Sequence, residues 1–292
     1  MNTKNIRLKA YLATTLSCLL IAVTLASHKS IPPRDRPNPY YIIQLSDPQL
    51  GFFNNDIDFV KDAEQLETAI AAVNRLKPAF VVVTGDLVNK IGDIEQITAY
   101  KRITAKLDRS IPLYNLPGNH DVGNEITAES LKTYRKHFGK DYYTIKKGGT
   151  TAIVLNSPLV VAGPDMAKAA DAQYRWLEKT LKRASRSGDN VIIFQHHPWF
   201  LHDPKEADQY FNIPLNIRKK YLSLLRSYGV KHVFAGHLHY NAAGDAGDLE
   251  MITTGPVGRP LKDDPSGIRI IKVSGNSVTH EYCPLESIPE HL

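Results

Sequence analysis

The sequence predicts an α/β fold whose functional site lies at the carboxyl ends of buried strands. Short apolar runs rich in Val, Ile and Leu recur along the chain from residue 40 onward. Several of these runs follow segments with helical periodicity, and polar residues of a few kinds follow the runs themselves. Strands that are apolar throughout are buried on both faces, which is typical of sheets covered by helices.

The apolar runs predict strands over 40–45, 80–84, 111–116, 151–155, 191–194, 230–235, 250–253, 268–273 and 277–282. The last runs follow one another without an intervening helix. Because neighbouring strands that are joined by short turns pair in antiparallel fashion, this part predicts an antiparallel finish or a second sheet.

Three helices are predicted from apolar residues that recur at helical spacing. They cover 59–73, 174–184 and 217–228. Gly188 follows the second and Gly229 follows the third, and glycine is the residue most often found just beyond a helix end.

The N-terminal residues 1–26 have the layout of a signal peptide or of an N-terminal membrane anchor. Basic residues precede an apolar stretch over 10–26, and small residues end that stretch. Residues 27–39 are rich in proline and predict a linker, so the folded domain is expected over 40–292. These features predict an exported protein, periplasmic or extracellular, that is either free or anchored in the membrane through residues 10–26.

The composition is that of an ordinary globular protein, with 42% hydrophobic and 23% charged residues. The formal net charge is +6, and three of the basic residues, Lys4, Arg7 and Lys9, lie in the N-terminal segment. The remaining charge is too small to indicate nucleic acid as a partner. With only Cys18 and Cys283, the chain cannot form a disulfide framework.

Polar motifs follow five of the predicted strands. They are Ser46-Asp47-Pro48-Gln49, Gly85-Asp86, Pro117-Gly118-Asn119-His120-Asp121, Gln195-His196-His197-Pro198 and Gly236-His237-Leu238-His239. Each motif alone is compatible with a turn or a packed loop. Because sites in open α/β sheets collect beyond the carboxyl ends of the strands, all five together predict one shared site.

The residue types in these motifs suit divalent cations. Carboxylate and amide oxygens are ligands for hard cations, and imidazole is a ligand for borderline ones. One shared carboxylate can bridge two metals roughly 3.5–4 Å apart, and such a pair can clamp a phosphate and generate hydroxide near neutral pH. The motifs contain no cysteine, which argues against a closed structural zinc site.

These motifs resemble those of the calcineurin-like metallophosphoesterases, whose pattern is Asp-x-His, Gly-Asp, Gly-Asn-His-Asp/Glu, His and Gly-His-x-His. The resemblance covers about residue 40 to the C-terminus. The segments Ser-Asp-Pro-Gln-Leu-Gly and Phe-Gln-His-His-Pro-Trp-Phe are most similar to the calcineurin-like phosphoesterase domain-containing protein 1 type, described as serine/threonine phosphatases. The resemblance implies a four-layer α-β-β-α sandwich with a dinuclear metal site.

The resemblance also implies roles for individual residues. The first metal would be held by Asp47, Gln49, Asp86 and His239. The second would be held by Asp86, Asn119, His196 and His237, with Asp86 as the bridge. His120 would protonate the leaving oxygen, Asp121 would orient His120, and His197 would face the substrate.

One position departs from the family pattern, because Gln49 stands where most members have histidine. A neutral amide oxygen is a weaker ligand, so this site is expected to bind loosely and to favour harder ions such as Mn²⁺ or Mg²⁺. The metals expected overall are two divalent ions among Mn, Fe, Zn and Mg. Further candidate substrate contacts are Asn124 and Arg259. Lys262 and Trp199 are weaker candidates, because surface charge explains Arg259 and Lys262 better than phosphate contact does, and packing explains Trp199 better than substrate contact does.

The expected reaction is hydrolysis of a phosphoester by a metal-bridging hydroxide. The first hypothesis is a phosphomonoesterase, with phosphoserine and phosphothreonine among the candidate substrates, either in a phosphoprotein or in a small molecule. The alternative is a phosphodiesterase acting on cyclic nucleotides or glycerophosphodiesters. An alternative of another class is an exported metal-binding protein without turnover, against which the presence of His120 and Asp121 argues.

Overall fold

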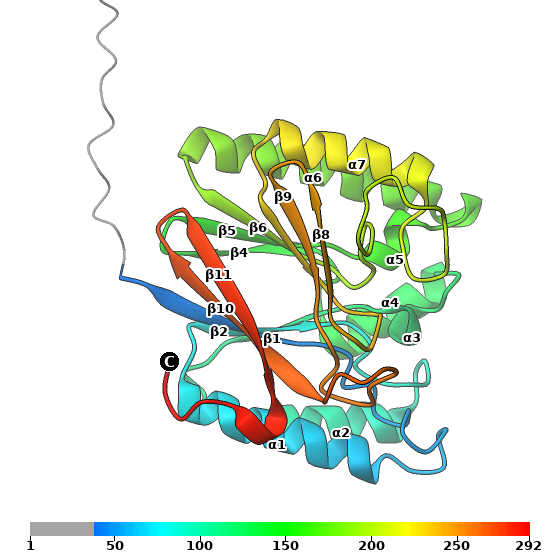
Figure 1. The fold of residues 1–292 in the computed structure, drawn as a ribbon. Helices are drawn as coiled ribbons and strands as arrows, with labels where there is room; N and C mark the ends of the chain where they lie inside the picture. Colours follow the sequence, from blue (N-terminus) through cyan, green and yellow to red (C-terminus); the bar gives the residue numbers. More distant parts are fainter. Residues whose placement is uncertain (1–37) are drawn as a thin grey trace, which may run out of the picture. The chain divides into compact units, whose positions relative to one another are not determined.

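The computed structural model describes residues 38–292. They form two β-sheets packed face to face, with helices on both outer sides (Figure 1). The predicted signal peptide or anchor, and all but the end of the predicted linker, lie outside the described residues. Among the helices of residues 38–292, none combines the length and the apolar character that a membrane span requires.

The first sheet has the strand order β11-β10-β1-β2-β3. Its strands are β1 (Tyr40–Leu45), β2 (Phe80–Thr84), β3 (Leu113–Leu116), β10 (Gly267–Ser274) and β11 (Ser277–Pro284). β1, β2 and β3 are parallel, whereas β10 runs antiparallel to β1 and pairs with β11 in the same sense. The predicted antiparallel finish is therefore confirmed, and it closes one side of the first sheet.

The second sheet has the strand order β4-β5-β6-β7-β9-β8. Its strands are β4 (Tyr143–Lys147), β5 (Thr150–Val154), β6 (Asn190–Phe194), β7 (His232–Ala235), β8 (Ala242–Ala246) and β9 (Leu249–Thr253). The four central strands are parallel, and the two edge strands β4 and β8 are antiparallel to their neighbours.

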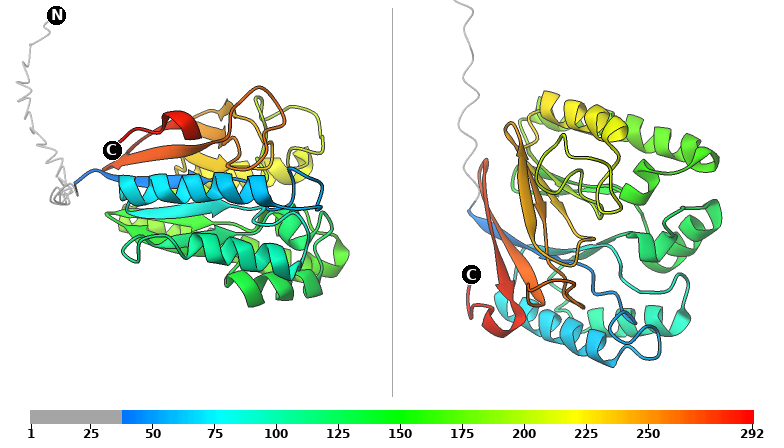
Figure 2. Two further views of the ribbon diagram at one scale, coloured as in Figure 1. Left: turned by 90° about the horizontal axis from the view of Figure 1, so that it is seen from below. Right: turned by 45° about the vertical axis from the view of Figure 1, so that its right-hand side comes forward.

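Apolar side chains from both sheets form the central core, among them Ile42, Val82, Phe194, Phe234 and Ile271. The helices α1 (Val60–Leu76) and α2 (Ile94–Thr104) cover the outer face of the first sheet. The helices α6 (Ala167–Ser187) and α7 (Leu215–Ser227) cover that of the second (Figures 1 and 2). The expected four-layer α-β-β-α sandwich is confirmed.

Individual residues mark the ends of α6 and α7 and the start of α2. Gly188 ends α6 in the left-handed conformation at φ 66°, and Gly229 follows α7 at φ 71°, so both predicted stops lie where expected. The side chain of Asp93 caps α2 by accepting bonds from the backbone N–H groups of Glu95 and Gln96.

Several elements are absent from the sequence-based prediction. β8 consists of Ala-Ala-Gly-Asp-Ala, which carries no β-branched or aromatic signal. β4, α2 and the helix α4 (Ala128–Phe138) were also not predicted, nor were the short helices α3 (Asn119–Val122) and α5 (Ser157–Val160). α6 begins at Ala167, before the predicted start at residue 174. Its first residues are mostly small or polar, so they lack the apolar periodicity on which the prediction relied.

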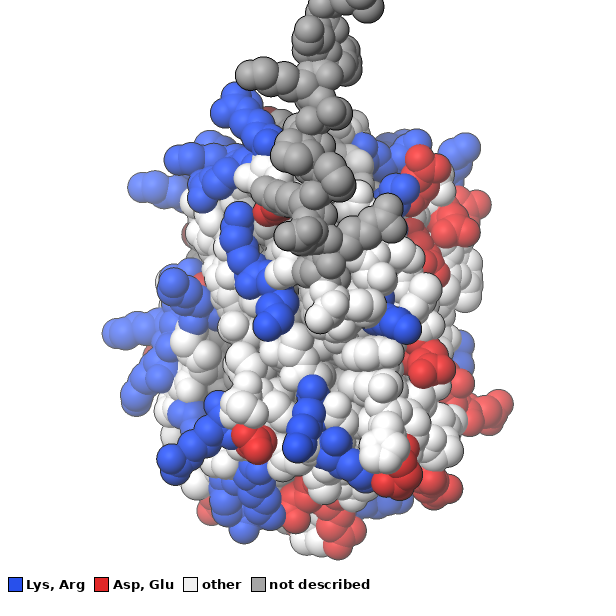
Figure 3. Space-filling view, turned by 90° about the vertical axis from the view of Figure 1, so that its left-hand side faces the viewer, with Lys and Arg blue, Asp and Glu red and all other residues white. Residues whose placement is uncertain are grey.

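The two ends of the sandwich carry different features, the strand-end motifs at one end and mixed surface charge at the other. The amino end of β1 lies at the left in Figure 1, whereas α3 and the loops that follow β1, β2, β6 and β7 lie at the right. Figure 3 shows the left-hand end, where Lys and Arg gather mainly on one side and Asp and Glu on the other. The strand-end motifs are therefore at the opposite end of the molecule from this surface of mixed charge.

Candidate metal centre

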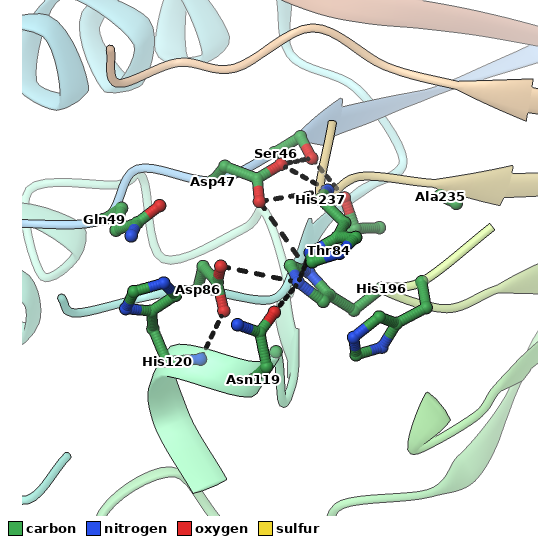
Figure 4. Close-up of polar contacts among 12 residues, drawn as sticks. Ser46, Asp47, Gln49, Thr84, Asp86, Asn119, His120, His196, Ala235 and His237 are labelled. Carbon is green, nitrogen blue, oxygen red and sulfur yellow. Dashed lines mark hydrogen bonds and ion pairs between the residues drawn. The ribbon is translucent and has the colours of Figure 1, made fainter. Parts of the chain in front are cut away.

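All seven predicted metal ligands lie together at the carboxyl ends of the strands, and Figure 4 labels all of them except His239. The first sheet supplies Asp47 and Gln49 after β1, Asp86 after β2 and Asn119 in α3 after β3. The second sheet supplies His196 after β6, and His237 and His239 after β7. Each of these side chains is at most 5% exposed.

A buried glutamine ties the two halves of the site together. Gln44 in β1 donates from Nε2 to the carbonyl of Ala235 in β7 at 3.0 Å, and to the hydroxyl of Thr84 in β2 at the same distance. Its Oε1 accepts from the Thr254 hydroxyl at 2.7 Å. These bonds fix the strand ends of one sheet against those of the other, and so set the position of Asp47 relative to His237.

The backbone is strained where the ligands lie. Among non-glycine residues, Asp47, Gln49, Asp86, His237 and His239 all have positive φ angles, between 36° and 74°. This conformation costs an L-residue roughly 1–2 kcal/mol. Strain of this kind persists only where the surrounding structure enforces it, and it clusters at functional sites.

Two motif glycines are required by close approach. A Cβ atom at Gly118 would clash with the carboxylate of Asp86, and one at Gly236 would clash with Ser46 and Asp47. The absence of a side chain at these positions lets the loops bring both carboxylates into the centre of the site.

Hydrogen bonds to backbone carbonyls fix the tautomers of three histidines. Nδ1 of His196 lies 2.9 Å from the Thr84 carbonyl, Nε2 of His237 lies 3.4 Å from the Tyr210 carbonyl, and Nδ1 of His239 lies 2.6 Å from the Arg259 carbonyl. Because a carbonyl only accepts, each contacting nitrogen carries the proton. The other nitrogen of each ring therefore presents a lone pair, as in histidines that bind metals.

These lone pairs converge with the carboxylates. Nε2 of His196 lies 3.2 Å from Nδ1 of His237 and 3.4 Å from a carboxylate oxygen of Asp86. Nε2 of His239 lies 3.7 Å from a carboxylate oxygen of Asp47. Lone pairs and negatively charged oxygens therefore face one another at short distances. A cation bound between them would offset their repulsion.

Gln49 is held by Asn89, a residue that sequence reasoning missed. Nε2 of Gln49 donates to Oδ1 of Asn89 at 2.8 Å, whereas Oε1 of Gln49 is buried and has no hydrogen-bond partner in the described part of the chain. An unsatisfied buried oxygen is costly. The amide is therefore oriented with its free oxygen available to a ligand, which fits a metal at this position.

Burial sets the charges of the site. It raises the pKa of the Asp47 carboxyl to about 7, and it lowers the pKa of His237 well below its usual range and that of His239 to a lesser extent. The imidazoles are thus kept neutral, as metal ligation requires. A bound cation would offset the cost of burying the two carboxylates.

Two groups of side chains in the described residues have the mutual distances needed for metal binding. One contains Asp47, Asp86 and His196, and the other contains His196, His197 and His237, with the ligand atoms of each group within 4.8 Å of one another. His196 belongs to both groups. His197 belongs to the second group by distance only, whereas Asp86 and Asn119 also lie next to Nε2 of His196. Asp86, Asn119, His196 and His237 are therefore available to a second cation beside the first.

His120 lies beside Asp86 and is partly exposed (Figure 4). Its backbone N–H donates to Oδ1 of Asp86 at 2.8 Å, and its ring Nδ1 lies 2.8 Å from the carbonyl of Asn89. The Asn89 carbonyl thus holds the ring and leaves Nε2 free for proton transfer.

Asp121 was expected to orient His120, and the hydrogen bonds of its carboxylate in the described residues go to the backbone rather than to the His120 ring. The Asp121 carboxylate accepts from the backbone N–H groups of Gly118 at 2.8 Å and of Leu87 at 3.0 Å. Consecutive residues of a helical turn point about 100° apart, so the two side chains of α3 diverge. Asp121 instead fixes the loop after β2, which carries Asp86 and Asn89.

His197 lies in the wall of the site and is 8% exposed. The Ser157 hydroxyl accepts the backbone N–H of His197 at 2.8 Å and that of His196 at 3.2 Å, so its proton is directed to Nδ1 of His197 at 3.0 Å. Nε2 of His197 then carries the ring proton. This nitrogen is a donor rather than a metal ligand, and its ring packs 4.3 Å from that of His237.

The other candidate contacts lie around the site to different degrees. The Arg259 guanidinium lies 5.4 Å from the Phe52 ring, while its carbonyl holds His239. Asn124 accepts from the Tyr210 hydroxyl at 3.4 Å. Trp199 is fully buried against Tyr221, with ring centroids 4.9 Å apart, and is therefore a packing residue. Lys262 lies over the Tyr240 ring at 3.5 Å.

Comparison with known proteins agrees with this geometry. Residues 40–241 match the model of the calcineurin-like phosphoesterase family. The chain is 35% identical to the serine/threonine-protein phosphatase CPPED1 of Danio rerio, over 86% of this chain and 87% of that protein. It is 34% identical to the protein of the same name from Homo sapiens, over 91% and 90% of the two chains.

A solved structure of a dimetal phosphatase from Danio rerio has the same fold, with a TM-score of 0.60, 17% identity and coverage of 82% of this chain and 98% of that one. The family match covers the strands β1 to β7 and all five motifs. The chain belongs to the calcineurin-like phosphoesterase family and is a metal-binding phosphoric ester hydrolase.

Proposed function

We propose that this hydrolase is a phosphomonoesterase that works with two divalent cations. The observation that supports the cations is the 3.2 Å approach of Nε2 of His196 to Nδ1 of His237, beside the Asp86 carboxylate. The choice of monoesters rests on the relatives, which are named phosphatases. Both nitrogens present lone pairs, and so does the unpartnered Oε1 of Gln49. Cations bound among these atoms would satisfy all of them at once.

The ligand sets follow from the proximity of these atoms. The first cation would be held by Asp47, Gln49, Asp86 and His239. The second would be held by Asp86, Asn119, His196 and His237. When bound, the two cations supply a nucleophile at neutral pH and neutralise the charge of the phosphate.

Residues of the chain itself would supply the proton for the leaving oxygen and position the ring that carries it. When the His120 ring is protonated on both nitrogens, Nδ1–H donates to the Asn89 carbonyl and Nε2–H can pass its proton to the leaving oxygen. The neutral ring that remains keeps Nδ1–H on this carbonyl. Asp121 holds the loop that carries this carbonyl and acts as a positioning residue. His197 would donate from Nε2 and support the wall of the site.

The donor set supports a preference among metals. Gln49 offers a neutral oxygen at the first site, which favours Mn²⁺ or Mg²⁺ there, whereas two imidazoles at the second site suit Zn²⁺, Fe or Mn²⁺. Elemental analysis of the purified protein tests this preference. Two zinc ions per chain would contradict it.

The names of the relatives support phosphoserine or phosphothreonine as the substrate group, because the alignments extend over most of both chains. The test compares hydrolysis of p-nitrophenyl phosphate, bis-p-nitrophenyl phosphate and a phosphoserine peptide with added Mn²⁺, using His120→Ala as the control. We expect preference for the monoesters. Preference for the diester would instead support a phosphodiesterase, and metal binding without activity above the control would support a non-catalytic protein.

We propose further that residues 40–292 act outside the cytoplasm, because residues 1–26 have the layout of an export signal. Fractionation of cells that express the full chain tests this location. Recovery of the protein in the cytoplasm with residues 1–26 intact would contradict it.

A further inference from the structure

Tyr210 lies beside proposed ligands of the second metal, although none of the five motifs contains it. Its side chain is 59% exposed, yet its backbone carbonyl holds His237 at 3.4 Å and its ring lies 5.2 Å from the His237 ring. Its hydroxyl accepts from Nδ2 of Asn119 at 3.3 Å and donates to Asn124 at 3.4 Å. Tyr210 therefore contacts two of the proposed ligands of the second metal while its ring remains open to solvent.

The loop of residues 201–214, which carries Tyr210, is held in one conformation by Glu206. The Glu206 carboxylate accepts from the backbone N–H groups of Leu201 at 2.8 Å and His202 at 3.1 Å, and from Nδ2 of Asn212 at 2.7 Å. One side chain thus joins both ends of the loop.

Arg218 in α7 holds the same loop through hydrogen bonds to its backbone. Its side chain is fully buried, and it donates to the carbonyls of Ile213 at 3.0 Å, Pro204 at 3.1 Å and Glu206 at 3.0 Å. Loss of these bonds would leave a buried charge without partners, which is strongly destabilising, so the bonds hold the loop in place. The 201–214 loop is therefore preorganised, and Tyr210 does not need to be ordered by a ligand.

A second aromatic residue lies on the side of the first metal. The Phe52 ring lies 5.0 Å from the ring of His239 and 6.5 Å from that of His120, and the Arg259 guanidinium lies over it. Phe52 and Tyr210 therefore lie next to the ligands of different metals. Both residues are at least partly exposed, so each offers aromatic surface beside the proposed ligands.

We infer that Tyr210 is a specificity-determining residue whose ring contacts the leaving group of the phosphoester and favours planar, apolar leaving groups. This inference rests on the proposed phosphomonoesterase function alone. It predicts that esters with planar leaving groups are hydrolysed with higher kcat/KM than phosphoserine or phosphothreonine, whose leaving groups are aliphatic. The hydroxyl has a separate part, which is to orient Asn119. Because orientation of Asn119 affects every substrate alike, the ratio of kcat/KM between two substrates reports on the ring alone.

The test compares p-nitrophenyl phosphate, which has a planar leaving group, with glycerol 2-phosphate, which does not. For Tyr210→Leu in the full chain with Mn²⁺, we expect the ratio of kcat/KM to fall roughly 3–10-fold, the usual range for an aromatic contact. Tyr210→Phe keeps the ring and is expected to keep the ratio. Tyr142→Leu, which removes a tyrosine packed on Trp176 away from the metal ligands, is the matched control and is also expected to keep it.

A ratio in Tyr210→Leu within twofold of the unsubstituted protein would overturn the inference, and so would an equal fall in Tyr210→Phe. A protein that hydrolyses neither ester would contradict the proposed function itself. Inhibition by inorganic phosphate, which has no leaving group, is expected to show the same fold-change in Tyr210→Leu and Tyr210→Phe. A larger loss of phosphate binding in Tyr210→Leu would assign the ring to the phosphoryl group and contradict the leaving-group contact.

Discussion

Nε2 of Gln49 donates a hydrogen bond to Oδ1 of Asn89 at 2.8 Å, and this bond decides which end of the Gln49 amide faces the metal centre. The same asparagine holds the ring of His120 through its backbone carbonyl at 2.8 Å. A single residue thus orients a proposed ligand of the first metal with its side chain and the proposed acid with its main chain. Only the side-chain contact can be removed by substitution.

Replacing Asn89 with alanine is expected to weaken one metal site and leave the other intact. Loss of an outer partner of a metal ligand typically reduces metal affinity 10–100-fold. Titration calorimetry with Mn²⁺ should show two binding events in the unsubstituted protein, and in Asn89→Ala one of them should be weaker by this factor.

Two further variants separate orientation of Gln49 from other effects of this substitution. Asn89→Asp still offers an acceptor to Nε2 of Gln49 and should retain the tighter binding. In a Gln49→Ala background, Asn89→Ala should have no additional effect, because the group that it positions is gone. An equal, additive loss in both backgrounds would refute the positioning role.

Replacing Asp86 with alanine is expected to abolish binding of both metals, because this carboxylate lies 3.4 Å from Nε2 of His196 and belongs to both proposed ligand sets. Asp47→Ala is the matched comparison and should retain one equivalent per chain. Elemental analysis after desalting measures both. Two equivalents in Asp86→Ala would rule out the bridge.

Replacing His120 with alanine should leave the metal content unchanged and reduce turnover roughly 10²–10⁴-fold, the usual range for general acid catalysis. The loss should be largest for an alkyl phosphate, since a poor leaving group depends most on protonation. Steady-state kinetics with glycerol 2-phosphate measures it. Turnover equal to that of the unsubstituted protein would show that another group delivers the proton.

Asp62, which is not a proposed metal ligand, is expected to make the stability of the folded protein depend on pH. Its carboxylate is fully buried in α1 and accepts from the backbone N–H of Gly51 at 3.0 Å, and burial raises its pKa from 3.8 to about 6. A raised pKa means that the folded state binds the proton more tightly. The stabilisation is complete below the unfolded pKa of 3.8 and is lost as the pH rises through about 6.

The matched variant is Asp62→Asn, which stays neutral and loses one acceptor equally at every pH. Between pH 4 and pH 7 the free energy of unfolding of the unsubstituted protein should fall relative to Asp62→Asn by roughly 1–3 kcal/mol. Urea unfolding at both pH values measures the difference. A constant difference would show that Asp62 titrates normally in the folded protein.

The central strands and the positions of the proposed ligands could both be predicted from the sequence, and the physical reason is the same. Strands such as 80–84 are continuously apolar because both of their faces are buried, and the first polar residue after each, such as Asp86, lies at the edge of the sheet. Edge strands lack this signal. β8 is built of small residues and owes its conformation to pairing with β9, so only the tertiary structure reveals it.

The residues that surround the ligands could not be predicted in the same way. Asn89 and Tyr210 act through contacts between segments far apart in the sequence, and Tyr210 lies in an irregular loop whose shape depends on Glu206 and Arg218. The family resemblance implied that Asp121 orients His120, but it did not indicate through which contacts. Adjacency within a helical turn separates side chains in direction, and this geometry appears only once α3 is known to be helical.

The most direct test of the account is a titration of the metal-free protein with Mn²⁺ while hydrolysis of p-nitrophenyl phosphate is followed. If the convergent lone pairs and carboxylates hold a dinuclear centre for monoester hydrolysis, activity should rise with added metal and level off once two sites per chain are filled, while His120→Ala stays far below at every point. Activity that is complete before any metal is added, or that never exceeds that of His120→Ala, would contradict it.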